Sequence, residues 1–150
     1  MTAGARTLTG ADVVKLLPHR HPMLLLDGVT ELIAGEAGTG LKNISISDPV
    51  FAGHFPGEPI YPGAHLIEVS AQVAAVILNA LPTEDGEPQI GYLATVKRFV
   101  FTQPIRPGDQ VSIRVEKKTV FGLLAEFSVV ARVLGAVVAK GSIVIAIAGR

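Results

Sequence analysis

The chain has 150 residues, of which 49% are apolar and 17% charged, and its formal net charge is zero. This length suits one domain with a core of its own, and the zero net charge disfavours the broad basic surface of a nucleic-acid-binding protein. The absence of cysteine excludes disulfides, a thiol nucleophile and thiolate metal sites. No apolar run reaches the ~20 residues of a membrane span, and the N-terminus lacks the apolar core of a secretory signal. A single cytoplasmic domain over residues 1–150 is therefore expected.

The first part of the chain predicts a short helix and two strands. Thr9 is an N-cap residue and Asp12 stands three positions later in a capping-box pattern, so a helix is expected from there to Pro18, which ends it. Two stretches rich in Leu, Val and Ile follow at residues 23–33 and 39–46, with glycines between them. They predict a strand, a turn and a strand.

A rigid loop and one long helix occupy the middle of the chain. Residues 47–63 contain four prolines and three glycines, a density that fixes the path of a loop and excludes regular structure. Residues 64–80 contain neither Gly nor Pro and are rich in Ala, Leu, Ile and Val, which predicts a helix. Apolar residues surround most of its circumference, and many are small. This pattern predicts a buried helix against which a sheet packs closely.

The remainder of the chain predicts four long strands. They are expected at residues 90–102, 110–120, 123–134 and 137–148. Apolar and polar residues alternate over 111–116, as in a strand with one buried face, and Gly122 and Gly135 lie where hairpin turns are needed. The order of elements predicts an α+β fold in which an antiparallel sheet folds over one helix.

Three polar residues share one face of the long helix. His65, Glu68 and Gln72 are spaced i, i+3 and i+7, and a carboxylate in so apolar a helix needs a reason because an unpaired buried charge is costly. Glu68 is a candidate proton carrier, and Gln72 is a candidate to orient its carboxyl group. Alternatively, this face is solvent-exposed or packs at a polar dimer seam, and Gln72 is an ordinary helix residue. His65 and Glu68 also have the spacing of a metal pair, but further zinc ligands are not evident.

A histidine lies in the rigid loop before the helix. His54 is in the segment GHFPG (53–57), where glycines permit tight turns and proline stiffens the path. A histidine fixed on such a loop, close to a helix that carries Glu68, suits an acid–base pair. The alternative interpretation is a turn histidine that bonds to nearby backbone.

Four segments of the sequence resemble the signature blocks of one enzyme family. They are LPHRHPMLLLD (17–27), KNISISDPVFAGHFPGEPIYPG (42–63), HLIEVSAQ (65–72) and RFVFTQPIRPGDQV (98–111). The blocks resemble those of bacterial (3R)-3-hydroxyacyl-acyl-carrier-protein dehydratases of the FabZ type, and they cover the domain almost from end to end. The resemblance implies the α+β hot-dog fold, in which a long antiparallel sheet wraps around a central helix, here at about residues 64–80.

The resemblance also implies a site and a reaction. In the family, the histidine of GHFPG and the glutamate of the central helix form the site, which places these roles on His54 and Glu68. The two residues usually come from different subunits, so a homodimer or a trimer of dimers with sites at the dimer interface is expected. A helix-start glycine, matched here by Gly63, polarises the thioester carbonyl. The expected reaction removes water from a 3-hydroxyacyl thioester, with His54 taking the C2 proton and Glu68 protonating the departing hydroxyl group.

Such a substrate arrives on the phosphopantetheine arm of an acidic acyl carrier protein, and no metal or other cofactor is expected. An apolar tunnel beside the helix is expected to take the acyl chain, and its candidate residues are Ile60, Tyr61, His65, Leu66, Val96, Phe99 and Phe101. The family usually has apolar residues in place of Tyr61 and His65. A basic patch for docking the carrier protein has as candidates Lys97, Arg98, Arg106 and Arg132. Core packing and solvated surface charge are the alternative roles of these two sets.

Other functions remain open on the sequence alone. A hot-dog thioesterase would use a carboxylate and water to hydrolyse the thioester, but a glutamate rather than an aspartate on the helix favours the dehydratase. A non-catalytic, carrier-binding subunit of a heterodimer commonly lacks one catalytic residue, whereas this chain has both. Fatty-acid biosynthesis and a polyketide or polyene pathway use the same chemistry, and the sequence is compatible with both.

Overall fold

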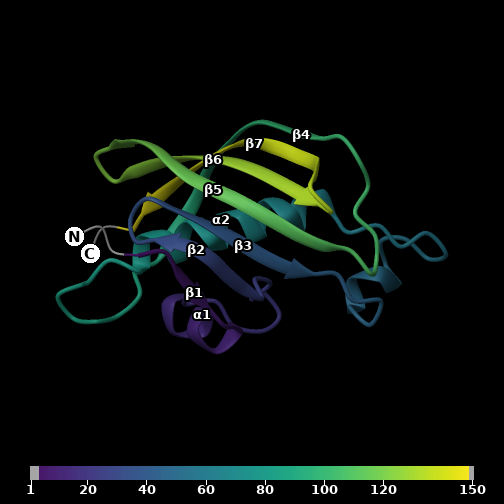
Figure 1. The fold of residues 1–150 in the computed structure, drawn as a ribbon, viewed down its shortest axis with the longest axis horizontal. Coiled ribbons are helices and arrows are strands. Elements are labelled where there is room, and N and C mark those ends of the chain that lie inside the picture. Colours follow the sequence, from purple (N-terminus) through teal and green to yellow (C-terminus); the bar gives the residue numbers. More distant parts are fainter. Residues whose placement is uncertain (1–3, 149–150) are drawn as a thin grey trace.

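A computed structural model describes residues 4–148, which form one antiparallel sheet wrapped around a long helix (Figure 1). The strands in this part of the chain are β1 (Arg6–Leu8), β2 (Gly28–Ile33), β3 (Ala37–Asn43), β4 (Gly91–Phe101), β5 (Gln110–Phe121), β6 (Leu124–Val133) and β7 (Ala136–Ile147). The helices are α1 (Gly10–Leu16) and α2 (Gly63–Asn79), and a 3₁₀ turn, η1 (Pro49–Ala52), precedes α2. The strands lie in the order β1-β2-β3-β5-β6-β7-β4, so β1 and β4 are the edges of the sheet. The predicted α+β architecture is confirmed.

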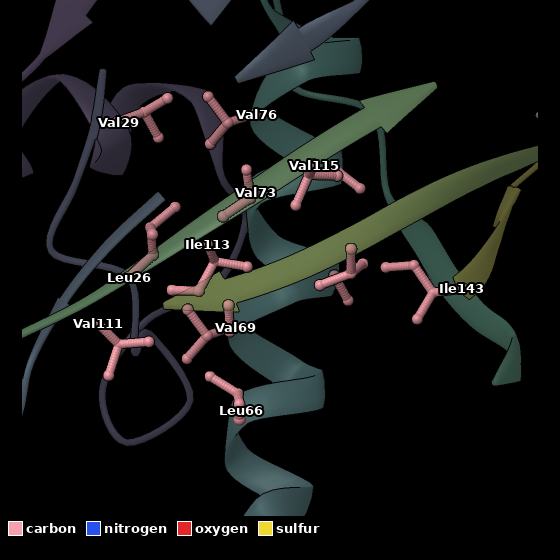
Figure 2. Packing of buried hydrophobic residues seen from close by; sticks show 14 of the residues in the cluster. Leu26, Val29, Leu66, Val69, Val73, Val76, Val111, Ile113, Val115 and Ile143 are labelled. Carbon is pink, nitrogen blue, oxygen red and sulfur yellow. The ribbon is translucent and has the colours of Figure 1, made fainter. Parts of the chain in front are cut away.

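Helix α2 lies at the centre of the core. Figure 2 shows the side chains of the helix directed toward those of the strands, and the labelled residues of the two groups are Leu66, Val69, Val73 and Val76 on α2 and Val111, Ile113, Val115 and Ile143 on β5 and β7. All of them are buried. Because burying one such side chain contributes about 1.5–3 kcal/mol, this contact fixes α2 against the sheet. The polar residues of α2 are thereby held in defined positions.

At Gly40, strand β3 lies too close to α2 to leave room for a side chain. A Cβ atom at Gly40 would overlap the side chain of Val73, and one at Gly38 would lie 3.4 Å from Ile77 Cγ1. From the sequence, this close packing was expected to depend on small residues of the helix. The structure shows that glycines on the strand also make it possible.

We expect Gly40→Ala to lower the free energy of unfolding by about 1–3 kcal/mol, because Val73 is fully buried and has no room to move aside. Urea unfolding at a fixed protein concentration measures the effect. Gly53→Ala is the matched control, since its added Cβ would lie no closer than 3.9 Å to another group. Equal stability of the two variants would show that the β3–α2 contact relaxes easily.

The two hairpin turns between β5, β6 and β7 are confirmed. Gly122, with φ of 59°, connects β5 to β6, and Leu134 and Gly135, with φ of 49° and 81°, connect β6 to β7. Positive φ at both central residues is the geometry of a type I′ turn, whose twist matches that of the flanking strands. The predicted capping box of α1 is also present, with the Thr9 and Asp12 side chains each accepting from the other's backbone N–H.

The strand predicted over residues 23–33 is wrong in its first half, because β2 begins only at Gly28. The backbone N–H groups of Leu25 and Leu26 donate to Oε1 of Gln72, at 3.0 and 3.2 Å, and not to a neighbouring strand. Leu26 is nevertheless buried. The apolar character of this segment therefore reflects burial and not β structure.

The other differences are smaller. The next strand is displaced, since β3 covers 37–43 where 39–46 was predicted. Strand β1 was not predicted, and the loop over 47–63 contains the 3₁₀ turn η1, whose N-cap Asp48 accepts from Val50 N at 2.9 Å. Helix α2 begins one residue earlier than predicted, so Gly63 is its first residue. Within residues 4–148, no helix is both long and apolar enough to cross a membrane.

Candidate active site

The loop between η1 and α2 holds His54 in one orientation. Its Nδ1 lies 2.7 Å from the carbonyl oxygen of Ile60, and its ring stacks on Phe55 with the centroids 3.9 Å apart. A carbonyl oxygen can only accept, so the hydrogen of the neutral ring is on Nδ1. No hydrogen bond to Nε2 occurs within the described residues. His54 therefore presents an unprotonated, unpaired Nε2, which is what a general base requires.

The start of helix α2 lies beside this histidine. A cavity of about 300 Å³ is lined by His54, Ile60, Tyr61, Gly63, Phe101, Thr102, Gln103, Pro104 and Ile105. Gly63 N has no acceptor among residues 4–148, as expected at the first position of a helix. A Cβ atom at Gly63 would lie 2.8 Å from Cζ of Phe101, so a larger residue here would displace that ring. The cavity thus combines a base with a free N–H donor at a helix N-terminus.

Glu68 lies one and a half turns further along α2 and has different neighbours. Its side chain is 24% exposed. Its Oε1 accepts a hydrogen bond from Nε2 of Gln72 at 2.9 Å, so the predicted contact between these two residues is present. Glu68 is not among the residues that line the His54 cavity. Within one chain, this cavity therefore contains His54 without Glu68, the other member of the predicted acid–base pair.

One neighbour of Glu68 was not predicted from the sequence. His19 Nε2 lies 3.5 Å from Glu68 Oε1, and its side chain is as little exposed as that of the glutamate. His19 follows α1, far from Glu68 in sequence, and is part of the motif LPHRHPMLLLD. That motif was the only signal in the sequence that could have pointed to it.

The predicted tunnel residues are only partly brought together. Ile60, Tyr61 and Phe101 line the His54 cavity, whereas His65 lines a separate one. Leu66 is fully buried in the core and Val96 is exposed on β4. Phe99 packs against the core and over Gly141 of the neighbouring strand.

The predicted basic patch is likewise only partly assembled. Lys97 and Arg98 line a cavity of about 680 Å³ on the outer face of the sheet, together with Lys140. Arg106 lies elsewhere and pairs with Glu58 at 2.7 Å, and Arg132 is outside this cavity. Among residues 4–148, no three His, Cys, Asp or Glu side chains cluster as a metal site would require.

Tyr61 forms the inner wall of the His54 cavity. It is 3% exposed, and its ring contacts Phe51 and His65, with centroids 6.4 and 5.7 Å apart. Its hydroxyl oxygen is buried with no hydrogen-bond partner among the described residues. Burial raises the pKa of the Tyr61 phenol, and the Asp48 carboxylate adds to the effect. The phenol is therefore held neutral.

We expect Tyr61→Phe to raise the free energy of unfolding by about 1 kcal/mol at neutral pH, because it removes a buried hydroxyl group that lacks a partner. The raised pKa keeps the folded phenol protonated, whereas an unfolded tyrosine ionises near pH ~10. The parent protein therefore loses stability as the pH rises past the pKa of the unfolded tyrosine. The difference in free energy of unfolding between Tyr61→Phe and the parent should increase there. Tyr92→Phe, at an exposed tyrosine, should change nothing. Urea titrations at several pH values measure both, and a less stable Tyr61→Phe would mean that the hydroxyl group has a partner.

Comparison with known proteins decides the family. A family model described as a FabA-like domain matches residues 17–148. The chain belongs to the FabA-like family. A relative in this family, the "3-hydroxyacyl-[acyl-carrier-protein] dehydratase FabZ" of Granulibacter bethesdensis, is 41% identical over 143 residues, which cover 94% of this chain and 84% of the relative. The predicted resemblance to FabZ-type dehydratases is confirmed.

Solved structures confirm the fold of this FabA-like chain. The dehydratase heterocomplex ApeI:P from Xenorhabdus doucetiae matches with a TM-score of 0.78 at 20% identity, covering 92% of this chain and 91% of the other. A hot-dog-like protein from Thermanaerovibrio acidaminovorans matches with a TM-score of 0.62 at 24% identity, covering 79% and 84%. At such identities the likeness concerns the fold alone. The predicted hot-dog fold is correct.

Proposed function

We propose that this chain eliminates water from (3R)-3-hydroxyacyl thioesters carried on an acyl carrier protein, giving trans-2-enoyl thioesters for fatty-acid biosynthesis. The observation that carries this proposal is the His54 cavity. A histidine with its lone pair on Nε2 faces the same space as the unpaired N–H of Gly63. The name of the FabZ relative, at 41% identity over most of both chains, supports the same substrate class.

Each group has one task in this reaction. Nε2 of His54 takes the proton from C2, and the thioester carbonyl oxygen, where negative charge develops, accepts from Gly63 N–H at the positive end of α2. Glu68 gives a proton to the C3 hydroxyl group as the C3–O bond breaks, so water leaves and the C2–C3 double bond forms. His54 then holds one extra proton and Glu68 lacks one. Transfer of that proton through water restores both residues.

In this proposal the two residues of one site come from two chains. That Glu68 does not line the cavity that His54 occupies in the same chain supports this arrangement. Strand β4 is an edge of the sheet, and its exposed apolar residues are Tyr92, Leu93, Val96, Val100 and Phe101. An apolar edge strand is a template for pairing with a further strand. The proposed working unit is a homodimer that pairs along β4, on its own or as part of a trimer of dimers.

The carrier protein delivers the substrate on its phosphopantetheine arm, and the proposed reaction needs no other cofactor. The proposed docking surface includes Lys97 and Arg98, which lie together beside Lys140 on the outer face of the sheet. Lys97 is paired with Glu126 at 3.2 Å, so part of its charge is already compensated. Complementary charge there would chiefly increase the rate of encounter with an acidic carrier.

The assay is the incubation of the purified protein with 3-hydroxyacyl-carrier protein, followed by mass spectrometry of the acyl group. Loss of one water, or its gain when enoyl-carrier protein is supplied, is the expected result. Release of free acid would instead show a thioesterase. No change in mass, with both substrates and over several chain lengths, would contradict the proposal and leave a carrier-binding role.

A further inference from the structure

The carboxyl group of Glu68 is held by only one of its two oxygens. Oε1 accepts from Gln72 Nε2 at 2.9 Å and lies 3.5 Å from Nε2 of His19. Within residues 4–148, no hydrogen bond or ion pair reaches Oε2. The two oxygens are therefore not equivalent, and the difference comes from the side chains around them.

Gln72 has a fixed orientation because all of its polar contacts agree. Its Oε1 accepts from the backbone N–H groups of Leu25 and Leu26, and its Nε2 donates to the carbonyl oxygen of Met23 at 2.7 Å. A backbone N–H can only donate and a carbonyl can only accept, so the amide cannot be flipped. The N–H directed at Glu68 therefore makes Oε1 an acceptor. When Glu68 is protonated, its hydrogen is on Oε2.

The ring of His19 is constrained in the same sense. Its Nδ1 is buried with no hydrogen-bond partner in the described part of the chain. A hydrogen on Nδ1 would leave a buried donor unsatisfied and would turn a bare Nε2 toward an oxygen that must accept. In the neutral ring with its hydrogen on Nε2, the unpaired group is an acceptor and not a donor, and Oε1 of Glu68 lies 3.5 Å from that Nε2.

Arg20 holds the turn that carries His19. Its Nη1 donates to the carbonyl oxygens of Leu17 and His19, at 2.8 and 2.7 Å. The backbone N–H groups of Met23 and Leu24 both donate to the carbonyl of Arg20. Leu17 is fully buried in the core. The imidazole is thus presented from a closed turn anchored on the core.

We propose that His19 is a positioning residue for Glu68. Together with Gln72 it fixes Oε1 as an acceptor and so reserves Oε2 as the oxygen that delivers the proton to the departing hydroxyl group. The role of Glu68 as proton donor rests on the proposed function. The arrangement of the three side chains is independent of that function. The proton passes from Oε2 to the C3 oxygen as the C3–O bond breaks, and water leaves. His19 itself touches no reacting atom.

Two amide substitutions test whether an N–H at the position of Nε2 is what matters. In His19→Gln the side-chain N–H can reach the position of Nε2, whereas in His19→Asn it can reach only that of Nδ1. We expect His19→Asn and His19→Leu to lower kcat by roughly 10- to 100-fold with KM almost unchanged. His19→Gln should restore kcat to near the parent value. His21→Gln, at an exposed histidine in the same turn, is the matched control and should behave like the parent.

Other kinetic results would overturn the inference. Equal kcat for the Gln and Asn variants would mean that the N–H at Nε2 is irrelevant. An increase in KM with kcat unchanged would mean that His19 binds substrate. Thermal unfolding and light scattering of each variant identify a loss of fold or assembly, and the His19→Gln variant keeps the test valid if His19→Leu is unstable.

A second measurement does not depend on turnover. Long-range ¹H–¹⁵N spectra of the histidine rings distinguish the tautomers, and the His19→Gln spectrum assigns the His19 signals by their absence. The expected tautomer of the neutral ring has its hydrogen on Nε2. An Nδ1–H tautomer would overturn the inference even in an active enzyme. A parent protein that shows the expected tautomer and no elimination would instead contradict the proposed function alone.

Discussion

His54→Ala and Glu68→Gln should each lower kcat/KM for elimination by about 10²- to 10⁴-fold, the range expected when a general base or acid is removed. The alanine removes the only group in the His54 cavity with a free nitrogen lone pair, and the glutamine cannot release a proton. Steady-state kinetics on carrier-bound substrate measure the loss. Unchanged thermal unfolding should accompany it, since neither side chain is part of the apolar core. Full activity in either variant would remove that residue from the site.

Mixing the two inactive variants should restore activity. If each site takes His54 from one chain and Glu68 from its partner, a mixed dimer has one site with both residues intact and one with both replaced. When two-fold symmetric dimers assemble at random, about half of them are mixed, and each mixed dimer has one intact site of two. About a quarter of the parental activity is therefore recovered. The experiment is co-expression of the two chains with different tags, compared with each variant alone. No recovery in isolated mixed dimers would place both residues of a site on the same chain.

Val96→Lys should give a monomer that is about as inactive as His54→Ala. Val96 lies at the middle of β4, an exposed apolar edge of the sheet, with 42% of its surface accessible. When two copies of an antiparallel edge strand pair about a two-fold axis, residues near the middle lie close to their own counterparts. The substitution therefore brings two like charges together in a strip that is otherwise apolar. Light scattering and activity on the same samples measure the two effects.

Val120→Lys is the matched control for this prediction. Val120 is an exposed valine of similar accessibility, 56%, but it lies near the end of β5, away from the β4 edge, and pairs with Ala125 of β6. It should remain assembled and active. A Val96→Lys protein that stays dimeric would rule out pairing along β4. A monomeric one with full activity would rule out a site shared between chains.

The elements that local sequence determines were predicted well. Helix α2, the hairpin glycines and the capping box at Thr9 each depend on neighbouring residues, so the pattern and the structure agree to within a residue or two. Residues 23–26 look like a strand because they are apolar, but the backbone N–H groups of Leu25 and Leu26 donate to Gln72 and not to another strand. No local pattern reveals a hydrogen bond to a side chain so far away in the sequence.

The site was predictable to the same extent. His54 and Gly63 come together because one short loop carries both, and Gln72 meets Glu68 because they are one turn apart on a helix. His19 was missed because its contact with Glu68 exists only after the turn behind α1 packs against α2. His65 and Phe99 were placed in the tunnel from their neighbourhood in sequence, yet their side chains lie outside the His54 cavity.

The four-way bonding of Gln72 has a consequence for how descendants of this gene can diverge. The side chain orients Glu68, but it also terminates two backbone N–H groups and one carbonyl of residues 23–26. A duplicated copy that no longer catalyses the reaction could lose His54 and Glu68 with fewer backbone groups affected. Loss of Gln72 would leave three backbone groups without their partner, two of them in partly or fully buried residues. In such a lineage Gln72 should be retained after His54 and Glu68 are lost. Its presence in a paralogue would then be evidence of ancestry and not of activity.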